Sequence, residues 1–323
     1  MPAGPMLVVL GEVVVDLLEQ SDGDLRPVPG GSPANVALAL ARLGDHVELM
    51  ARFGGDALGD RCERHVRDNG VGLAYAVRAD QPSTLALVTL DELGHARYGF
   101  WTEGTSDWQW TAAELAATPT DAAALHTGSL ASWLPPSAAP VLDLLHRTRA
   151  ADATTVSYDP NVRAALMGTP DQGRAAVEGA VAAAHVVKAS DEDVAWLYPG
   201  TGLTEVAARW LGLGADLVVV TRGADGPLGI TADAVVDRAA PGVRVSDTVG
   251  AGDTFTAGLL HGLAARDALG AGPSARLRAL SADALGDVLH TAAAAAALTC
   301  TRPGCDPPTA AELDAFLAAE PTP

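Results

Sequence analysis

The sequence of 323 residues contains few cysteines and few aromatic residues. Its three cysteines, Cys62, Cys300 and Cys305, form an odd and sparse set, which argues against a disulfide framework and favours buried, inert thiols. Aromatic residues make up only 4% of the chain. Ala, Val and Leu must therefore build most of the core, which suits helices packed closely on a buried sheet.

Positive charge is also scarce. The formal net charge is −19, and Lys188 is the only lysine. A charge of this sign excludes the basic footprint of a nucleic-acid-binding protein, so no nucleic-acid partner is expected. An anionic ligand would have to be bound by backbone amides, a metal ion or a few well-placed arginines.

Long apolar stretches are missing as well. No uninterrupted apolar run is long enough to span a bilayer. The first residues carry neither the basic region nor the long apolar region of a signal peptide. The sequence therefore predicts a cytoplasmic protein without a membrane partner.

After Thr111, apolar strand patterns alternate with helical patterns along the chain. This alternation predicts the α/β class, with a mostly parallel central sheet that is covered by helices on both faces. Ligands of such sheets bind at the carboxyl ends of the strands. Asp159, Lys188 and Thr221 fall at predicted strand ends.

Two segments, about 13–29 and 72–110, do not follow this alternation. The second contains two apolar runs, 85–90 and 97–101, separated by a turn and followed by further aromatic residues. Such a pattern is typical of a hairpin. We expect a single domain over residues 1–323, in which these segments form a small β layer beside the larger α/β body.

The most informative stretch is residues 247–255. The small residues Gly250, Ala251 and Gly252 let the backbone approach a ligand closely, and the helix that follows directs its free amides at phosphate oxygens. Asp253, in the first helical turn, can accept the proton of an attacking hydroxyl. The alternative is a simple glycine turn with an acidic residue favoured by the helix dipole.

A second stretch supports the first. Gly30 and Gly31 lead into a predicted helix whose first turn carries Ser32, Pro33 and Asn35. A plain N-cap at Ser32 with Pro33 at the first helical position explains those two residues. It does not explain the two glycines or the asparagine. Free amides and a carboxamide suit a polyhydroxylated ligand.

In their order and separation, the two stretches resemble the two signatures of the ribokinase-like sugar kinases, the pfkB family. The resemblance covers nearly the whole chain. It implies a three-layer αβα body with a small β-sheet lid, formed by the segments 13–29 and 72–110, over the sugar. It also implies transfer of the γ-phosphoryl group of ATP to a sugar hydroxyl.

The resemblance further implies a role for individual residues. Asp253 would be the catalytic base. The anion hole would be formed by the amides of Gly250, Ala251 and Gly252. The sugar hydroxyls would be bound by Asp16, Gly30, Gly31 and Asn35.

Three features resemble the fructokinase branch and imply D-fructose as the acceptor: Gly11-Glu12 ahead of Asp16, the segment 159–163, and the aromatic segment 104–110. Arg163 would lie near the sugar or the transferring phosphate, or else form a surface ion pair. Arg97, on the lid hairpin, would reach the sugar or be an exposed strand residue.

Other acceptors stay open, because the sugar is chosen by lid side chains. A related kinase could phosphorylate 2-keto-3-deoxygluconate, a deoxygluconate, ribose or a nucleoside. A sugar sensor that kept the fold and lost turnover is the rival outside the enzymes, and the intact Gly250–Asp253 turn argues against it.

The nucleotide side resembles the family in part. Residues 221–226 match its Thr-x-Gly-x-x-Gly turn, and the family's Asn-x-x-Glu motif for phosphate and magnesium begins here with Ser190 and ends with Asp193. Asp193 would act on Mg²⁺ through water, since magnesium usually keeps several waters. Ala293 stands where relatives often carry Asn or His facing adenine. The residues expected to bind ATP are Lys188, Ser190, Thr221, Gly223 and Gly226.

Two expectations concern further partners. Asp247 and Gly304 occupy positions that match a monovalent-cation site of many relatives, which implies activation by K⁺; a turn residue that bonds its own backbone is the alternative for Asp247. A homodimer through the lid is expected, because an aromatic-rich lid sheet needs its outer face covered. The eight histidines are scattered and none has metal-site spacing.

Overall fold

The computed structural model describes residues 4–20, 22–90 and 96–319, and it describes no side chain between 88 and 98. Among these residues, eight strands form the large sheet in the order β14-β13-β12-β11-β10-β9-β1-β4. The strands are β1 (Met6–Leu10), β4 (His46–Met50), β9 (Ala124–Gly128), β10 (Thr155–Asp159), β11 (Val186–Ser190), β12 (Leu217–Thr221), β13 (Pro227–Ile230) and β14 (Val235–Asp237). In this sheet order, the strands from β12 to β4 are parallel to one another, whereas β13 and β14 pair in antiparallel fashion. The predicted α/β class with a mostly parallel sheet is therefore confirmed.

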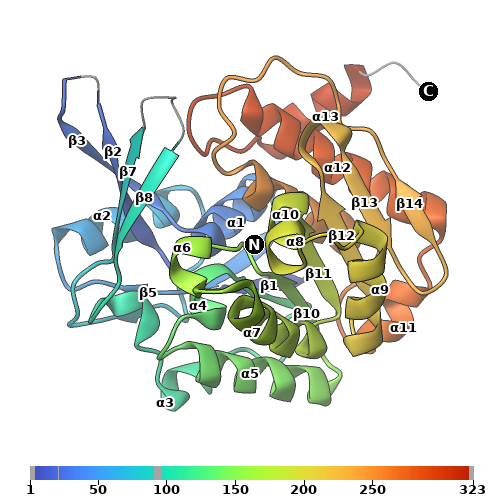
Figure 1. Cartoon of the computed structure of the whole chain (residues 1–323), viewed down its shortest axis with the longest axis horizontal. Helices are drawn as coiled ribbons and strands as arrows, with labels where there is room; N and C mark the ends of the chain where they lie inside the picture. Colours follow the sequence, from blue (N-terminus) through green and yellow to red (C-terminus); the bar gives the residue numbers. More distant parts are fainter. Residues whose placement is uncertain (1–3, 21, 91–95, 320–323) are drawn as a thin grey trace.

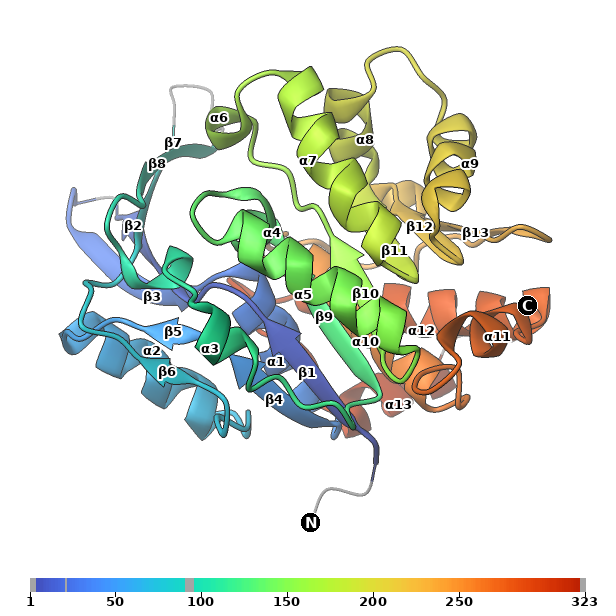
Figure 2. The same cartoon turned by 90° about the horizontal axis from the view of Figure 1, so that it is seen from below.

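Helices cover both faces of this sheet, as Figure 2 shows. Side chains alternate along each strand, so Leu7 and Val9 of β1 enter one core, whereas Val8 and Leu10 enter the other. The first core is closed by α1 (Ser32–Arg42), α2 (Ala57–Asp68), α10 (Ala251–Ala264), α11 (Pro273–Arg278), α12 (Ala282–Cys300) and α13 (Ala310–Ala319). The second is closed by α3 (Ala112–Leu115), α4 (Ser129–Trp133), α5 (Ala138–Ala151), α6 (Ala164–Met167), α7 (Pro170–Ala183), α8 (Asp191–Leu197) and α9 (Leu203–Leu213).

Small residues bring α10 and α12 into close contact. A Cβ atom at Gly258 would lie 2.8 Å from the Cα atom of Ala292. The alanine-rich segment of α12 therefore packs directly against the helix that carries Asp253. A chain with so few aromatic residues builds its core in this way, by close approach of helix backbones.

A second, smaller sheet projects from the body (Figure 1). Its strands are β2 (Val14–Glu19), β3 (Leu25–Gly30), β7 (Leu85–Leu90) and β8 (Ala96–Trp101), in the order β3-β2-β7-β8. Asp16 pairs with Val28 and Ala86, and its neighbour Leu17 pairs with Leu87. Since successive side chains of a strand point to opposite faces, Asp16 and Leu17 lie on opposite faces of the small sheet.

Buried polar contacts join the small sheet to the body. Asp107 accepts hydrogen bonds from the Val13 amide at 2.8 Å and from the Thr84 hydroxyl at 2.5 Å. Arg52 donates to the Ser106 carbonyl at 2.9 Å. The chain thus enters and leaves the small sheet at one hydrogen-bonded junction. The short strands β5 (Arg52–Phe53) and β6 (Val77–Arg78) and the 3₁₀ turns Ser106–Trp108 and Gly223–Asp225 complete the fold.

Two expectations concern membrane-spanning helices and the burial of the cysteines. In the described part of the chain, no helix is long and apolar enough to cross a bilayer. All three cysteines are free, as expected, but only Cys62 is buried. Cys300 and Cys305 are partly exposed, so the expectation of three buried thiols was wrong for these two. Cys300 is the last residue of α12 and Cys305 lies in the loop that follows, where the chain leaves the core.

Candidate active site

The first turn of α10 provides free backbone donors. Gly250 precedes the helix with a φ of 75°, and a Cβ atom there would overlap the Sγ atom of Cys305, so only glycine fits. The Ala251 amide donates to the Thr248 carbonyl at 3.2 Å. Within the described residues, the amides of Gly252 and Asp253 have no hydrogen-bond partner. They carry the partial positive charge of the helix N-terminus, which suits phosphate oxygens.

The Asp253 side chain meets the first turn of α1. Its Oδ1 atom accepts a hydrogen bond from the Ser32 hydroxyl at 2.6 Å, and its Oδ2 atom accepts one from the Asn35 amide at 2.8 Å. Burial raises the pKa of Asp253, whereas the Ser32 and Asn35 hydrogen bonds and the nearby Lys188 ammonium lower it. The two sequence motifs thus form one site, although they lie more than 200 residues apart.

The reading of Ser32 as a plain N-cap was wrong. The N-cap of α1 is Gly31, Ser32 is the first helical residue, and no side chain caps the helix. Gly31 has a φ of 103°, which a residue with a side chain rarely adopts. The Ser32 hydroxyl therefore does not cap its own helix and donates to Asp253 instead.

The small sheet contributes Asp16 to the same site. A Cβ atom at Gly30, on the neighbouring strand, would overlap the Asp16 carboxylate, so the glycine makes room for it. Burial raises the pKa of Asp16 to about 6, with Arg163 lowering it and Asp253 raising it further. Asp16 therefore interacts electrostatically with both Arg163 and Asp253.

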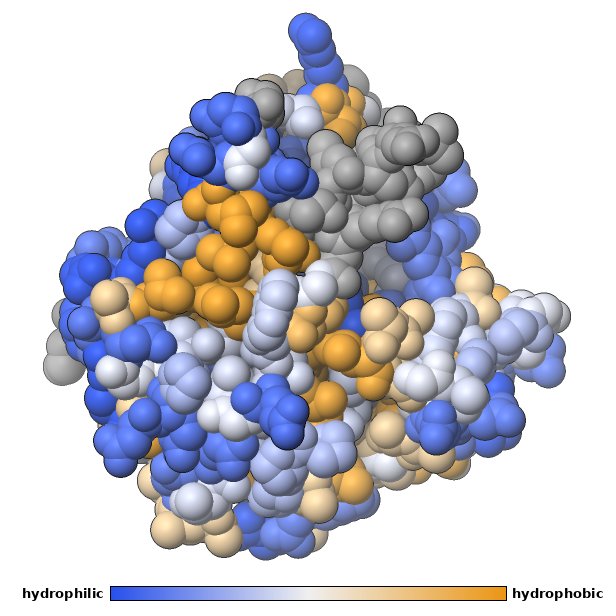
Figure 3. Space-filling model, turned by 60° about the vertical axis from the view of Figure 1, so that its left-hand side comes forward, coloured by the Kyte–Doolittle hydropathy of each residue, from blue (hydrophilic) through white to orange (hydrophobic). Residues whose placement is uncertain are grey.

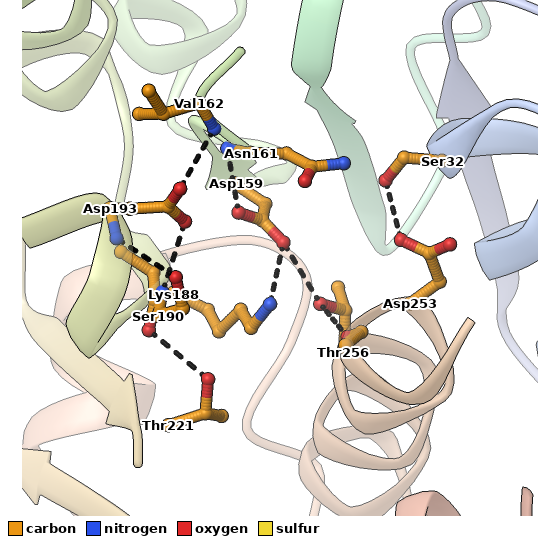
Figure 4. Close-up of polar contacts among 12 residues, drawn as sticks. Ser32, Asp159, Asn161, Val162, Lys188, Ser190, Asp193, Thr221, Asp253 and Thr256 are labelled. Carbon is orange, nitrogen blue, oxygen red and sulfur yellow. Dashed lines mark hydrogen bonds and ion pairs between the residues drawn. The ribbon is translucent and has the colours of Figure 1, made fainter. Parts of the chain in front are cut away.

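A buried ion pair lies between the two halves of the site. The Lys188 ammonium contacts Asp159 at 2.9 Å, and both side chains are almost fully buried. A Cβ atom at Gly252 would lie 3.2 Å from the Lys188 Nζ atom, so the ammonium sits against the first turn of α10. Figure 4 shows this pair between Asp253 and Ser32 on one side and Ser190 and Thr221 on the other.

Ser190 and Asp193 form the capping box of α8. The Ser190 hydroxyl accepts from the Asp193 amide at 3.0 Å, and the Asp193 carboxylate accepts from the amides of Ser190 at 3.1 Å and Val162 at 3.0 Å. Burial and the nearby Asp159 raise the pKa of Asp193. Each carboxylate oxygen thus accepts one backbone amide, which orients the Asp193 side chain and leaves one acceptor site on each oxygen.

A cavity of about 400 Å³ adjoins the first turn of α10. One side is formed by the turn after β12, which includes Thr221, Gly223 and Gly226. Gly223 and Gly226 have φ values of 52° and 79°, so both glycines are required by the backbone of this turn. The other side is apolar and includes Val245, Ala293, Ala297 and Cys300, and a purine ring would fit between such surfaces.

The two arginines expected at the sugar differ in what is described. Arg163 donates to the Asn161 side-chain oxygen at 2.7 Å and to the Val162 carbonyl at 3.0 Å, and it lowers the pKa of Asp16. Among the described residues its hydrogen bonds go to the oxygens of Asn161 and Val162 and to no carboxylate. Arg97 lies in β8, but its side chain falls outside the described residues.

The proposed cation residues also lie together. The Asp247 carboxylate accepts from the Gly304 amide at 2.7 Å and from the Val249 amide at 3.1 Å. The bond to Val249 is the local backbone contact that was the alternative for Asp247, and it coexists with the long-range contact to Gly304. Among the described residues, no group of three or more His, Cys, Asp or Glu side chains forms a metal site.

Two site residues were missed at the sequence level. Ser32 was assigned to capping, and Asp159 was noted as a strand end and as part of the segment 159–163, without a role in the site. Thr256 supports Asp159 with a bond of 3.5 Å and lies one turn after Gly252 on α10. The only signal for the ion pair was the single lysine at the end of β11, a position where this fold directs side chains at the ligand edge.

The arrangement defines a class of protein. Free amides at a helix N-terminus, a carboxylate beside them, and a cavity bordered by a glycine turn form a site for transfer of a phosphoryl group to a hydroxyl. The αβα body with its small second sheet is the scaffold of the ribokinase-like kinases.

Comparison with known sequences identifies the family. The profile of the pfkB family carbohydrate kinases matches residues 5–312, so the chain belongs to this family, and its reaction is the ATP-dependent phosphorylation of a carbohydrate. A fructokinase of Rhizobium leguminosarum bv. trifolii is 34% identical over 262 residues, which are 80% of this chain and 79% of the relative. A fructokinase of Salmonella typhimurium is 34% identical over 264 residues, 80% of this chain and 84% of the relative.

Solved structures agree with this assignment. The fructokinase of Xylella fastidiosa with bound ATP has a TM-score of 0.89 at 27% identity, over 97% of this chain and 98% of that chain. A double-mutant fructokinase of Vibrio cholerae O395, with fructose, ADP and a potassium ion, has a TM-score of 0.84 at 27% identity, over 98% and 99%. The aminoimidazole riboside kinase of Salmonella enterica, with aminoimidazole riboside and an ATP analogue, has a TM-score of 0.79 at 25% identity, over 97% and 99%.

Proposed function

We propose that this protein transfers the γ-phosphoryl group of ATP to a hydroxyl of D-fructose. The observation that carries the proposal is the Asp253 carboxylate, which lies beside the free amides of Gly252 and Asp253 and faces the turn that carries Asn35. The similarity to fructokinases from several bacteria supports fructose over other acceptors.

Asp253 would act as the general base. The acceptor hydroxyl binds near its carboxylate, gives up its proton as the new bond to phosphorus forms, and the phosphoryl group passes in line from the leaving oxygen. Charge on the moving group is stabilised by the first-turn amides of α10 in the anion hole of Gly250, Ala251 and Gly252. The Lys188 ammonium, held against Gly252, adds positive charge beneath this turn.

The nucleotide would occupy the 400 Å³ cavity. Its phosphates would lie toward the amides of α10, near Lys188, Ser190 and the turn with Thr221, Gly223 and Gly226. The adenine base would lie between apolar side chains. Ala293 would line this pocket without offering a side-chain hydrogen bond to the base. Purine recognition would then rest on shape and backbone groups, because a hydrophobic pocket discriminates weakly between isosteres.

The sugar would bind between the small sheet and the body. Asp16, Asn35 and the amides around Gly30 and Gly31 would bond its hydroxyls, with Arg163 at the rim, and Arg97 remains a proposal for the same subsite. The small sheet would act as the lid. By covering the site it would exclude water, which otherwise competes with the sugar as the acceptor.

Two metal ions are part of the proposal. Mg²⁺ would bind the nucleotide phosphates and reach Asp193 through water, because magnesium usually keeps several waters and few protein ligands. It would neutralise charge on the phosphates. K⁺ would bind near Asp247 and the loop of Gly304, where Asp247 already holds the loop in place.

A homodimer through the lid remains a proposal as well. The face of the small sheet opposite Asp16 carries Leu17, Leu85 and Leu87, and Trp101 on this sheet is 55% exposed. In Figure 3, where the side of the molecule with the small sheet comes forward, a continuous hydrophobic area is visible. A second copy would cover such a face. A monomer by light scattering at micromolar concentration would refute the dimer.

The cytoplasmic location stays a prediction.

The test is ADP release with a panel of acceptors, with and without K⁺. D-fructose should give the highest kcat/KM among fructose, 2-keto-3-deoxygluconate, deoxygluconate, ribose and nucleosides. A higher value for a nucleoside or an acid sugar would replace fructose with that acceptor. No ADP release with any acceptor, together with retained sugar binding, would identify a sensor and not an enzyme.

A further inference from the structure

None of the roles proposed for the site residues explains the hydrogen bond between Ser32 and Asp253. The Ser32 hydroxyl donates to Asp253 Oδ1 at 2.6 Å, which is in the range of a charge-assisted hydrogen bond. The donor comes from α1 and the acceptor from α10, so tertiary structure alone brings them together. Ser32 makes no cap for its own helix.

Asn35 is the second donor to Asp253, but its position differs in one respect. Asn35 is proposed to bond a sugar hydroxyl, and its amide must then be shared between the sugar and the carboxylate. Ser32 has no such role under the proposed function. A carboxylate has about four acceptor sites, so Asp253 can accept from Ser32, Asn35 and a sugar hydroxyl at once. Ser32 is therefore the donor that stays with the carboxylate as the sugar binds.

The charges around Asp253 make this donor important. Asp159 of β10 and Asp16 of β2 lie close enough to couple with it, and Lys188 of β11 is the cation that faces it. The thiol of Cys305 is a further titratable neighbour, and burial followed by the Asp253 charge raises the pKa of that thiol. Lys188 is paired with Asp159, and Arg163 acts on Asp16, so the hydrogen bonds from α1 are the contacts that the described side chains make directly to the Asp253 carboxylate.

We propose that Ser32 is a positioning residue, whose hydroxyl orients the Asp253 carboxylate and keeps it in the ionised form that accepts the acceptor's proton. The inference rests on the proposed function of Asp253 as the base. A hydrogen bond to an ionised group favours that group's charged form. Loss of the Ser32 hydroxyl must therefore raise the pH at which Asp253 becomes a competent base.

The pH dependence of kcat/KM for the sugar tests this inference. Ser32→Ala should move the acidic limb up by about one pH unit, so that kcat/KM falls roughly tenfold at pH values below the limb, which corresponds to the loss of one charge-assisted hydrogen bond. The sugar KM should stay nearly unchanged. Ser32→Thr keeps a hydroxyl and should restore the wild-type limb. An unmoved limb in Ser32→Ala, or a rise in KM alone, would overturn the proposal.

Ser281→Ala is the matched control. Ser281 also stands at the start of a helix, where its hydroxyl accepts from the Ala284 amide at 3.1 Å. Gly258 of α10 meets Ala292 of α12 and Gly262 meets Val288, so the start of α12 lies toward the end of α10 that is opposite Asp253. This variant should lower thermal stability through loss of a cap and leave the acidic limb in place. A limb that moves equally in both variants would show that the shift in Ser32→Ala is a general effect of weakened packing, and would contradict the proposal.

A second measurement does not depend on turnover. In protein labelled with ¹³C at the aspartate carboxyls, the resonance that Asp253→Asn removes is that of Asp253. Its titration midpoint should be higher in Ser32→Ala than in the wild type. Equal midpoints would overturn the role of Ser32 whatever the kinetics show. Failure of the proposed function is recognised separately, as an inactive wild type in the sugar panel.

Discussion

The ligand edge of the body and the small sheet are built in opposite ways. In the body, the site side chains are held by neighbours: Lys188 by Asp159 and Asp193 by two backbone amides. The small sheet brings one carboxylate, Asp16, to the site and leaves Trp101 exposed elsewhere. Phosphoryl transfer needs donors at fixed positions, whereas a sheet that covers a ligand must also let it enter. Under the proposed function, this difference would place the reaction in the body and the choice of acceptor in the small sheet.

Both regions contain a glycine that another side chain approaches closely. The Cys305 side chain packs where a Cβ atom of residue 250 would lie, and the Asp16 carboxylate occupies the place of a Cβ atom of residue 30. In the first case the turn also needs a positive φ, so the whole backbone path depends on the glycine. In the second, only the room for one side chain depends on it. The division between reaction and acceptor therefore predicts different kinetic results for changes in the two regions.

The strongest test of the body is Asp253→Asn. This variant keeps the shape of the side chain and the contact to Ser32 but removes the base, so kcat should fall by roughly 10²–10⁴ while ATP affinity is retained. Steady-state kinetics and nucleotide titration measure the two effects. Asp283→Asn, another acid in the first turn of a helix, should have wild-type activity. Near-normal turnover of Asp253→Asn would remove the proposed base.

The buried ion pair should dominate the stability of the body edge. Lys188→Met leaves Asp159 buried without its cation, and the free energy of unfolding should fall by about 3–5 kcal/mol. Urea denaturation measures the change. The double variant Lys188→Met, Asp159→Asn should be more stable than the single one, because no unpaired charge remains. If both variants lose the same stability, the pair is not what holds this edge.

Glu12, at the junction of body and small sheet, should make stability depend on pH. Its side chain is fully buried, and burial raises its pKa from 4.5 to about 7. The folded state thus holds this proton more tightly than the unfolded chain, so the stabilisation is complete below pH 4.5 and is lost as the pH rises through about 7. The loss should reach about 3 kcal/mol.

Unfolding at pH 5 and pH 8 in the wild type and in Glu12→Gln measures this effect. The variant cannot ionise at this position, so its stability should fall less between the two pH values. Acids that do not interact with Glu12 contribute to both proteins and cancel in the difference, whereas Asp107, whose charge raises the pKa of Glu12, cancels only in part. A wild type and a variant with parallel pH profiles would contradict a titrating Glu12.

The small sheet is tested by Gly30→Ala. The added methyl group displaces the Asp16 carboxylate, so the sugar KM should rise about tenfold, the value of one lost hydrogen bond. The ATP KM should not change. Gly99→Ala in the same sheet is the control, because its Cβ atom would meet the Trp101 ring at an ordinary 3.8 Å. A fall in kcat without a change in the sugar KM would break the proposed division between the two regions.

Much of this molecule could be predicted from the sequence, because the predictable parts depend on local patterns. Alternating strand and helix patterns gave the α/β class, and the two glycine motifs gave residues that meet in the structure: Asn35 and Asp253 lie 2.8 Å apart. Short elements such as α4 and β6 were not predicted. They span five and two residues, which is too short for a periodic pattern to be recognised.

Neighbouring residues alone are enough to predict the polar residues at the strand ends, the glycine turn at Gly250 and the acid that follows it. Three contacts could be known only from the folded chain: the Ser32 hydroxyl bonds Asp253, Lys188 is buried against Asp159, and Asp107 joins the small sheet to the body. Each of these contacts joins residues that lie far apart in the chain. Its energy depends on burial and on exact distance, and folding alone supplies both.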